Sequence, residues 1–423
     1  MDETATPRQP VTRASMLVAA FSTIVEWYDF TLYLYFATVL SRVFFGAGAT
    51  ALAGTLGGFA IAYLMRPLGA AVFGHFGDRY GRRPMMLASM ALMTAAMLAT
   101  ALLPTAAQIG PAAGVLLILL RCVMSFSVGG EYTGVVAYLL EGARVERRGL
   151  ITSSASAASE VGALLAAGVS AATVSSLAPG ALESWGWRIP FFIGAGLASL
   201  VLLARSTMQE SPEFERQQAI GSVPARPLRH ALRHYRLAIG RGFAISALGS
   251  ITYYVGITYV PAFLTQHGAM SEGDALWLAT AAAVVVILVT PAVGWLSDRV
   301  GRRPVLIGLC ALAILLPWGM FALLTKSAGL ALLAALILAA LGGGVSAVGA
   351  VATAEQFPGE GRLTGLALGA TAATAIFGGF APYLAQLLTT LGNSPAAPGL
   401  LMVAVAVGVL PVLLRLPETR PRA

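Results

Sequence analysis

An apolar stretch at residues 21–40 carries two acidic side chains. It reads FSTIVEWYDFTLYLYFATVL, with Glu26 and Asp29 in one helical turn. An acid at the centre of a membrane helix costs on the order of 2.5–3.5 kcal/mol, so two acids must be compensated. Ser22, Glu26, Asp29 and Tyr33 are spaced four, three and four residues apart, which places them on one helical face. We expect that face to look into protein or a water-filled cavity.

The two acids have either a proton-carrying role or a structural one. Glu26 lies about 12 residues beyond the inner end of the expected helix, or roughly 18 Å at helical rise, which is near the middle of a membrane. Acids inside membranes usually serve function, and this favours a proton site or a substrate site. The alternative is a buried ion pair with Arg66 or Arg121 that holds the helices together.

Two arginines, Arg66 and Arg121, also lie within apolar stretches. Arginine stays charged at any relevant pH and offers a two-pronged donor to a carboxylate. Each is therefore a candidate clamp for a substrate carboxylate, and each is also a candidate partner for Glu26, Asp29 or Glu131. The partner role is favoured for Arg66, which is expected in the inner half of its helix, whereas the two roles are balanced for Arg121.

Glu131 and Glu160 are the other acids within apolar stretches. Glu160 lies in SASAASEVGALLAAG, whose small residues let a helix or a ligand approach closely. A buried acid in a low dielectric takes up a proton more readily than one in water. Both residues are candidate proton sites, and the alternative is a hydrogen-bonded structural acid.

The C-terminal half has no acid or base deep within an expected helix. It offers instead Tyr253 and Tyr254, in ITYYVGITY, and the hydroxyls of Thr371 and Thr374. The two tyrosines either line a cavity and hydrogen-bond a substrate or pack between helices. This asymmetry assigns charge handling to the N-terminal half and shape selection to the other.

The composition identifies a polytopic membrane protein. Of the 423 residues, 57% are hydrophobic and 11% charged, and the mean hydropathy is +0.78, whereas soluble domains carry about 25% charged residues. The net charge of +8 comes from short basic runs between apolar stretches, which indicates membrane topology and not nucleic-acid binding. The two cysteines and four histidines show no metal-ligand spacing, so we expect no metal and no cofactor.

Twelve apolar stretches are each long enough to span a bilayer as a helix. The fold class is therefore an all-α membrane protein with twelve transmembrane helices. Most of the 27 lysines and arginines fall on one side when the N-terminus is placed inside, which predicts cytoplasmic termini, and the first helix is expected to be retained. The expected helices lie near 15–42, 50–75, 84–104, 111–140, 150–176, 188–206, 238–266, 274–297, 304–325, 328–355, 363–390 and 397–416.

Two matched elements reveal an internal repeat. GDRYGRRP at 77–84 matches SDRVGRRP at 297–304, and each half has a glutamate seven residues before an arginine, Glu141 in the first and Glu355 in the second. Duplicated six-helix halves are typical of secondary transporters, whose substrate site lies between the halves. We expect two pseudo-symmetric bundles.

The predicted division is an N-terminal bundle at 1–206, a cytoplasmic linker at 207–237 and a C-terminal bundle at 238–423. The linker is charged and rich in proline. Its basic part, Arg226 to Arg236, is expected to lie on anionic lipid headgroups.

The paired loops resemble the signature loop of the major facilitator superfamily, and further stretches resemble its metabolite:proton symporter family. The members of that family carry α-ketoglutarate, citrate, shikimate, proline and betaine. One departure is RCVMS (121–125) on helix 4, where the family pattern is Arg-x-x-Gln-Gly. The chain has no glutamine at that place, so a contact that the glutamine makes in the family is not expected here. The matching stretches are VEWYDFTLYLYFA (25–37), LMRPLGA (64–70), SVGGEYTG (127–134), ESWGWRIPFF (183–192) and AIFGGFAP (375–382).

The paired loops are expected to form a gate on the cytoplasmic side. Gly77 and Gly81 permit tight turns, and Asp78 can face the positive N-terminal end of a neighbouring helix. The loop arginines can pair with Glu141 and with lipid phosphates; the alternative is that they only fix the topology. By the repeat, the predicted gating residues are Asp78, Arg79, Arg82, Arg83 and Glu141 in the first half and Asp298, Arg299, Arg302, Arg303 and Glu355 in the second.

We therefore predict a monomeric inner-membrane transporter that imports a small organic acid with protons by alternating access. Substrate or protons would neutralise the buried acids and lower the cost of rocking the halves. The predicted substrate and proton site comprises Glu26, Asp29, Tyr33, Arg66, Arg121, Glu131, Glu160, Tyr253 and Tyr254.

Four alternatives remain open. Helix 7 resembles the proline/betaine branch, which makes a zwitterionic solute the nearest alternative, although the end of the chain, LLRLPETRPRA, shows no long coiled-coil tail. A drug:proton antiporter usually has a Gly-Pro motif on helix 5, and this helix has no proline. A membrane sensor would need a signalling domain, and an enzyme would need a nucleophile–base or metal constellation.

Overall fold

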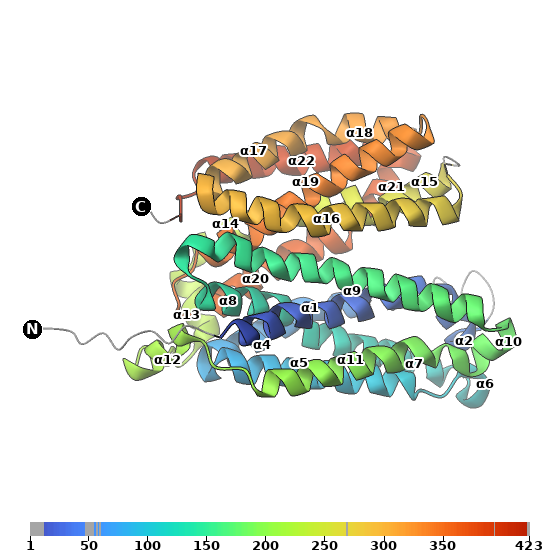
Figure 1. Ribbon diagram of the computed structural model, residues 1–423, viewed down its shortest axis with the longest axis horizontal. Helices are drawn as coiled ribbons and strands as arrows, with labels where there is room; N and C mark the ends of the chain where they lie inside the picture. Colours follow the sequence, from blue (N-terminus) through green and yellow to red (C-terminus); the bar gives the residue numbers. More distant parts are fainter. Residues whose placement is uncertain are drawn as a thin grey trace, which may run out of the picture.

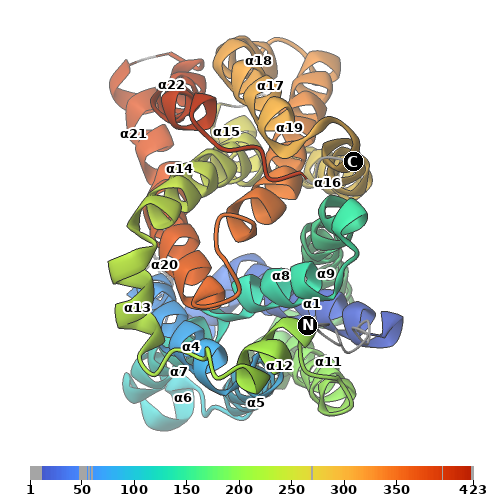
Figure 2. The same ribbon diagram turned by 90° about the vertical axis from the view of Figure 1, so that its left-hand side faces the viewer.

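The computed structural model describes residues 12–46, 55, 58, 61–267, 270–392 and 394–420, and the regular structure within these ranges is helical. The long helices run in roughly one direction, side by side (Figure 1). α1 begins, and α22 ends, at the end of the molecule that also carries α12 and α13 (Figures 1 and 2). The predicted all-α fold is confirmed.

The first half of the chain forms the helices that carry the predicted acidic and basic residues. They are α1 (Arg13–Tyr35), α2 (Ala37–Phe44), α4 (Met65–Tyr80), α5 (Arg82–Ala101), α6 (Ala106–Ile109), α7 (Ala112–Val128), α8 (Glu131–Gly142), η1 (Val145–Arg147), α9 (Arg148–Ser176), α10 (Pro179–Ala181), η2 (Leu182–Gly186) and α11 (Arg188–Ser206).

Two short helices, α12 (Pro212–Ala219) and α13 (Pro227–His234), lie between the halves in the chain. The second half forms α14 (Arg236–Tyr253), η3 (Tyr254–Thr258), α15 (Val260–Gln266), α16 (Glu272–Val300), α17 (Arg302–Leu315), α18 (Pro317–Leu324), α19 (Ala328–Ala354), α20 (Arg362–Thr374), η4 (Ala375–Gly379), α21 (Ala381–Gly392) and α22 (Ala397–Leu414).

The expected membrane helices are present, and several contain a break. Within the described ranges, nine helices are long and apolar enough to cross a membrane, and a pair bent by 46°, α17 with α18, makes ten. α1 follows the expected first helix, and α4 covers the described part of the second, whose earlier residues lie largely outside the described ranges. The structure is thus consistent with twelve spans.

The break between α7 and α8 has a packing reason. Gly129 and Gly130 separate the two helices, and a side chain at Gly129 would collide with the backbone of α4 at Arg66 and Ala70. Two glycines therefore let the helix that carries Glu131 pass close to the helix that carries Arg66.

The main contacts between the halves come from two helix pairs. α4 packs along α20, and α9 packs along α16. One apolar cluster draws on both halves, with Met85 and Leu139 from the first and Ala354 and Leu363 from the second. Met85 follows the first paired loop, and the other three residues flank Glu141, Glu355 and Arg362 in the chain, so this cluster seals the loop end of the interface.

Two π-helical turns face each other in the second half. η3 begins at Tyr254 and contacts η4, and Gly378 of η4 lies against the Tyr254 ring. Turns of this kind are frequent at functional sites, because they re-aim side chains from an otherwise regular helix. Here the turn sets the direction of Tyr254.

Candidate functional site

A central cavity of about 190 Å³ lies between the two halves. α1, α4, α8 and α9 line it from the first half, and α14, α16, α19 and α20 from the second. Drug-sized ligands occupy pockets of about 300–1,000 Å³, so this cavity suits a smaller molecule. Its lining includes Glu26, Arg66, Glu160, Tyr253, Tyr254 and Thr374.

Arg66 faces the cavity and is only loosely paired. Its Nη1 lies 3.9 Å from Glu26 Oε1, and its guanidinium lies over the rings of Phe30 and Tyr63, at 5.1 and 4.7 Å. Among the described residues, neither Glu26 Oε2 nor Arg66 Nε has a hydrogen-bond partner. Both groups therefore keep binding capacity for a ligand.

α4 is longer at its loop end than the sequence predicts. It runs on to Tyr80, beyond the expected end near residue 75, so that Arg66 lies roughly 21 Å from the loop end at helical rise. Arg66 lines the cavity and also lies near Glu26, so it remains a candidate for both of its predicted roles.

Two tyrosines connect the halves across the cavity. The Tyr253 hydroxyl donates to Glu160 Oε1 at 2.5 Å, and the hydroxyls of Tyr254 and Tyr63 are hydrogen-bonded at 2.7 Å. Trp27 packs edge-on against the Tyr253 ring at 5.5 Å. The shape of the cavity therefore depends on how the two halves are positioned relative to each other.

Asp29, Arg121 and Tyr33 lie behind the central cavity and do not line it. Arg121 Nη1 donates to Asp29 Oδ2 at 2.7 Å, and Nη2 donates to Thr100 at 3.2 Å. The guanidinium lies over the Tyr33 ring at 5.4 Å. A void of about 20 Å³ touches both this group and the Glu26–Arg66 pair. Asp29 and Arg121 therefore form a buried ion pair, as in the structural alternative that the sequence analysis gave for Asp29.

Glu131 also lies outside the cavity lining, in a buried cluster with Arg205. Arg205 donates to both carboxylate oxygens of Glu131, and the Ser89 hydroxyl donates to Oε2 at 2.5 Å. Arg205 Nη2 also contacts the Ser22 hydroxyl. Ser22, Glu26, Asp29 and Tyr33 are all buried, which confirms that their face looks into protein.

Sequence reasoning missed Arg205, because it lies at the end of an apolar stretch and resembles a topology charge. It is 0% exposed. Glu131 was the sequence feature that pointed to such a residue, because it is an acid in an apolar stretch whose cationic partner the sequence did not identify. An acid in that position requires a cation nearby.

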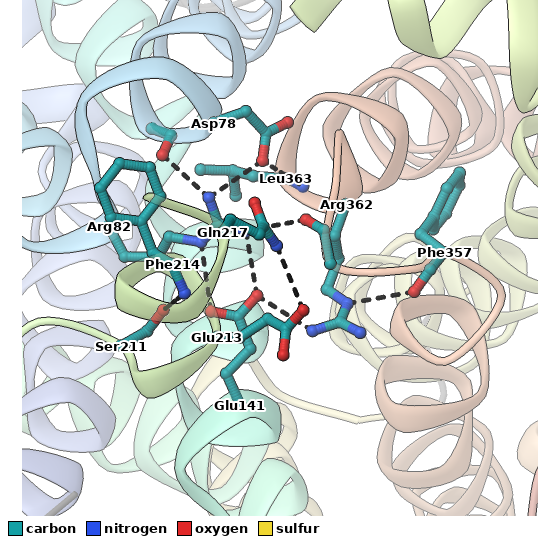
Figure 3. Close-up of polar contacts among 12 residues, drawn as sticks. Asp78, Arg82, Glu141, Ser211, Glu213, Phe214, Gln217, Phe357, Arg362 and Leu363 are labelled. Carbon is teal, nitrogen blue, oxygen red and sulfur yellow. Dashed lines mark hydrogen bonds and ion pairs between the residues drawn. The ribbon is translucent and has the colours of Figure 1, made fainter. Parts of the chain in front are cut away.

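The paired loops and the residues they bind form two similar clusters that we call the loop network, and Figure 3 shows its first copy, around Asp78, Arg82 and Glu141. Asp78 accepts the backbone N–H groups of Leu363 and Thr364 at 3.2 and 2.8 Å, at the N-terminal end of α20. Arg82 lies 3.1 Å from Asp78 and 3.0 Å from Glu141. Arg362, from the other half, also donates to Glu141 at 3.0 Å. This copy therefore binds the two halves together.

The second copy repeats the geometry. Asp298 accepts the N–H groups of Gly149 and Leu150 at 2.8 and 2.9 Å, at the N-terminal end of α9. Arg302 lies 2.7 Å from Asp298 and 3.2 Å from Glu355. The turns at Gly81 and Gly301 have φ values of +111° and +119°, which only glycine adopts at little cost.

The remaining loop arginines have other partners. Arg79 contacts the carbonyl of Ala225, and Arg83 donates to the carbonyl of Ser206 at 2.6 Å. The expectation that these two pair with Glu141 is therefore wrong, because Arg82 and Arg362 already occupy that carboxylate. In the second half Arg303 donates to the carbonyl of Leu414 at 2.6 Å, and Arg299 lies 4.1 Å from the Trp295 ring centroid.

Two glutamates that the sequence reasoning passed over cap the paired loops. Glu210 accepts the N–H groups of Arg82 and Arg83, and Glu418 accepts those of Arg302 and Arg303. Burial raises the pKa of Glu210 above its ordinary value, although the N–H donors oppose this. At Glu418, which is less buried, the donors outweigh burial and the pKa lies below its ordinary value.

Two family models match the chain. "Sugar (and other) transporter" matches residues 15–222, and "Major Facilitator Superfamily" matches 269–423. Among known proteins, the chain is 33% identical to the alpha-ketoglutarate permease of Escherichia coli K12, over 89% of this chain and 88% of that one. It is 31% identical to a citrate-proton symporter of Klebsiella pneumoniae, over 90% and 87%. It is 30% identical to the proline/betaine transporter of E. coli K12, over 97% and 84%.

Solved structures agree on the fold. The proton:xylose symporter XylE bound to 6-bromo-6-deoxy-D-glucose superimposes with a TM-score of 0.80, at 22% identity and over 96% of both chains. The inward-open form of XylE from E. coli gives 0.68, at 22% identity and over 96% and 97%.

Proposed function

Because the chain belongs to the major facilitator superfamily, in its metabolite:proton symporter family, we propose that it imports a small organic acid together with protons across the inner membrane. Both termini lie in the cytoplasm, and the protein works as a monomer. The chain is a multi-pass secondary active transporter and not an enzyme, as its relatives are permeases and symporters.

The exposure of Arg66 to the cavity carries the proposal. A carboxylate in the cavity would meet a guanidinium whose ion pair with Glu26 is as long as 3.9 Å. Arginine binds a carboxylate through two parallel hydrogen bonds, which fixes orientation as well as charge. A carboxylate substrate is therefore favoured.

Glu26 couples the proton to the substrate in this account. When Glu26 is ionised, it competes with the substrate carboxylate for Arg66. A proton on Glu26 removes the competitor and leaves Arg66 for the substrate. Proton and substrate then favour each other's binding, which is the requirement for symport.

Glu160 is the second proton site of the proposal. It is 4% exposed, and it accepts a hydrogen bond from the hydroxyl of Tyr253 on the other half. The charge on Glu160 sets the strength of this bond, since a hydrogen bond to an ionised acceptor is stronger than one to a neutral acid. Protonation of Glu160 therefore loosens one contact between the halves.

Alternating access would move the bundle at 1–206 against the bundle at 238–423, with 207–237 as the linker. The loop network is closed in this conformation, so that the cavity is shut on the cytoplasmic side. Opening that side must break the bonds from Asp78 to α20 and from Asp298 to α9. The loop network acts as the cytoplasmic gate.

A zwitterion such as proline or betaine is the second candidate. Trp27, Tyr63, Tyr253 and Tyr254 line the same cavity, and aromatic rings attract quaternary ammonium groups. Arg66 would then hold the single carboxylate of the zwitterion. Relatives of both kinds are similar to this chain to about the same degree, at 33% and 30% identity.

Uptake into proteoliposomes tests the proposal. The solutes are labelled α-ketoglutarate, citrate, proline and betaine, each with and without an inward pH gradient. We expect at least one solute to accumulate only with the gradient. Flux that ignores the gradient for every solute contradicts proton symport.

A further inference from the structure

We infer that the outer face of α13 is a binding site for anionic phospholipid headgroups, and that lipid bound there holds the cytoplasmic gate closed. The inference deepens the gating part of the proposed function. It assigns α13 a regulatory site that is separate from the cavity.

The outer face of α13 concentrates basic side chains. Arg229 and Arg233 of α13 are exposed and lie four residues apart, so they share one side of the helix, and Arg236, the exposed first residue of α14, lines the same surface hollow as they do. Arg236 is fixed there by a hydrogen bond from its Nε to the Leu232 carbonyl at 2.8 Å. With Leu228 and Leu232 the three arginines line this hollow, and none of the described residues that line it is acidic.

The place of α13 in the fold suits a lipid and not a soluble partner. Figure 2 shows α13 at the outer edge of the molecule, beside α4 and α20, at the end that carries the loop network. Leu232 and Leu237 are 48% and 68% exposed. Exposed leucines beside arginines at the rim of a membrane protein match the boundary between acyl chains and phosphates.

The inner face of α13 holds the two halves at the gate. Pro227 and Ala231 are buried, and α13 packs on both α4 and α20. Tyr235 lies edge-on to Phe357, and both His230 and Tyr235 lie close to Gly361, which caps α20. On the other side, Arg79 of α4 contacts the Ala225 carbonyl, just before α13.

These contacts couple lipid binding to the closed gate. α13 has eight residues, and isolated helices shorter than about 12–15 residues are marginal in water. Its helical form, which aligns the arginines, therefore depends on packing against α4 and α20 together. Opening the gate separates α4 from α20 and removes that support. Lipid then binds the closed conformation better, which is the requirement for shifting the equilibrium.

A spin-label distance measurement in nanodiscs tests the inference. Labels at Glu146→Cys and Arg415→Cys, in a Cys122→Ala/Cys310→Ala background, report the separation of the halves at the α13 end and need neither substrate nor proton. We expect phosphatidylglycerol added to phosphatidylcholine to raise the closed-to-open ratio by about tenfold.

Three variants carried on this background sharpen the test. Arg229→Gln/Arg233→Gln/Arg236→Gln should lose the response. The lysine triple at the same positions should keep most of it, because it retains the charge. Arg13→Gln/Arg144→Gln/Arg147→Gln removes the same charge from exposed sites at the same end and should respond like the parent protein.

The inference is overturned by the lack of a lipid response in the parent protein, or by a full response in the Arg229→Gln/Arg233→Gln/Arg236→Gln triple. Inorganic phosphate with pure phosphatidylcholine should leave the ratio unchanged, and an equal effect of free phosphate would contradict a lipid site. Because the readout needs no solute, its failure is distinguishable from a failure of the uptake panel.

Discussion

The loop network and the central cavity use the same residue types in opposite ways. In the loop network Asp78 has two backbone donors and Arg82, while Glu141 is shared by two arginines. In the cavity Glu26 has one ion-pair contact at 3.9 Å and one oxygen with no hydrogen-bond partner among the described residues. Charged groups whose hydrogen-bonding positions are filled by protein partners stabilise one conformation. Charged groups with unfilled positions are available to bind a ligand.

A second contrast lies between the two copies of the loop network. Glu141 binds Arg362 across the halves, whereas Glu355 accepts the hydroxyl of Thr419 from its own half, at 2.5 Å. Arg82 also donates to the carbonyl of Gly359 in the other half, at 3.2 Å. In the first copy, Glu141 and Arg82 therefore both bond residues of the other half.

The largest effect is expected where a saturated buried charge is removed. Arg205→Leu leaves Glu131 buried without its cation, which typically costs about 3–5 kcal/mol. We expect a large loss of folded protein, measured as thermal stability in detergent. Arg415→Leu, at an exposed arginine, is the control and should change little. Equal stability of the two variants would contradict the structural role of Arg205.

Arg66→Gln should show the reverse pattern, with transport lost and the fold kept. Removing one partner of a buried charge pair between protein and ligand costs about 2–5 kcal/mol, which is roughly 30-fold or more in affinity. The measurement is the concentration dependence of gradient-driven uptake. Unchanged affinity for every carboxylate would remove Arg66 from the substrate site.

Breaking the two copies of the loop network should have unequal effects. Arg82→Gln removes bonds that reach both halves, whereas Arg302→Gln removes bonds to its own half. The spin-label distances described above should show a larger open fraction for Arg82→Gln. An equal or larger open fraction for Arg302→Gln would contradict the asymmetry.

The smallest effect is expected for Tyr253→Phe, which removes a single hydroxyl. Its bond to Glu160 is the cross-bundle contact at 2.5 Å, and a hydrogen bond to a charged group contributes about 1.5–3 kcal/mol. We expect accumulation to fall while exchange of internal for external solute persists. Tyr259→Phe, whose hydroxyl bonds Gln386 outside the cavity lining, serves as the matched control. Equal accumulation in both variants would argue against a coupling role for Tyr253.

Hydropathy and the repeat predicted the all-α fold and the paired loops, because the cost of polar groups in lipid is visible along the chain. The preference of an acid for the N-terminal end of a helix predicted the contact of Asp78 with α20, and the repeat extended it to Asp298, which contacts α9. The partners within the cavity could not be predicted in this way. Which arginine meets which acid depends on helix rotation and on the breaks at Gly129 and Tyr254, which a single sequence does not show.

Arg66 and Arg121 illustrate the limit. Both are single arginines in apolar stretches, and sequence reasoning favoured the partner role for Arg66 and left the two roles balanced for Arg121. In the fold, Arg121 is locked to Asp29 at 2.7 Å, while Arg66 stays 3.9 Å from Glu26 and faces the cavity. A difference of about one ångström in pairing distance separates a structural pair from a candidate binding group.

The most direct test of the central claim is the pH dependence of substrate affinity in Glu26→Gln. If an ionised Glu26 competes with substrate for Arg66, this variant should bind the transported acid with the same affinity at pH 6 and pH 8 and should exchange it without a gradient. The parent protein should bind it more weakly at pH 8. Retention of the parent's pH dependence in Glu26→Gln would contradict the account.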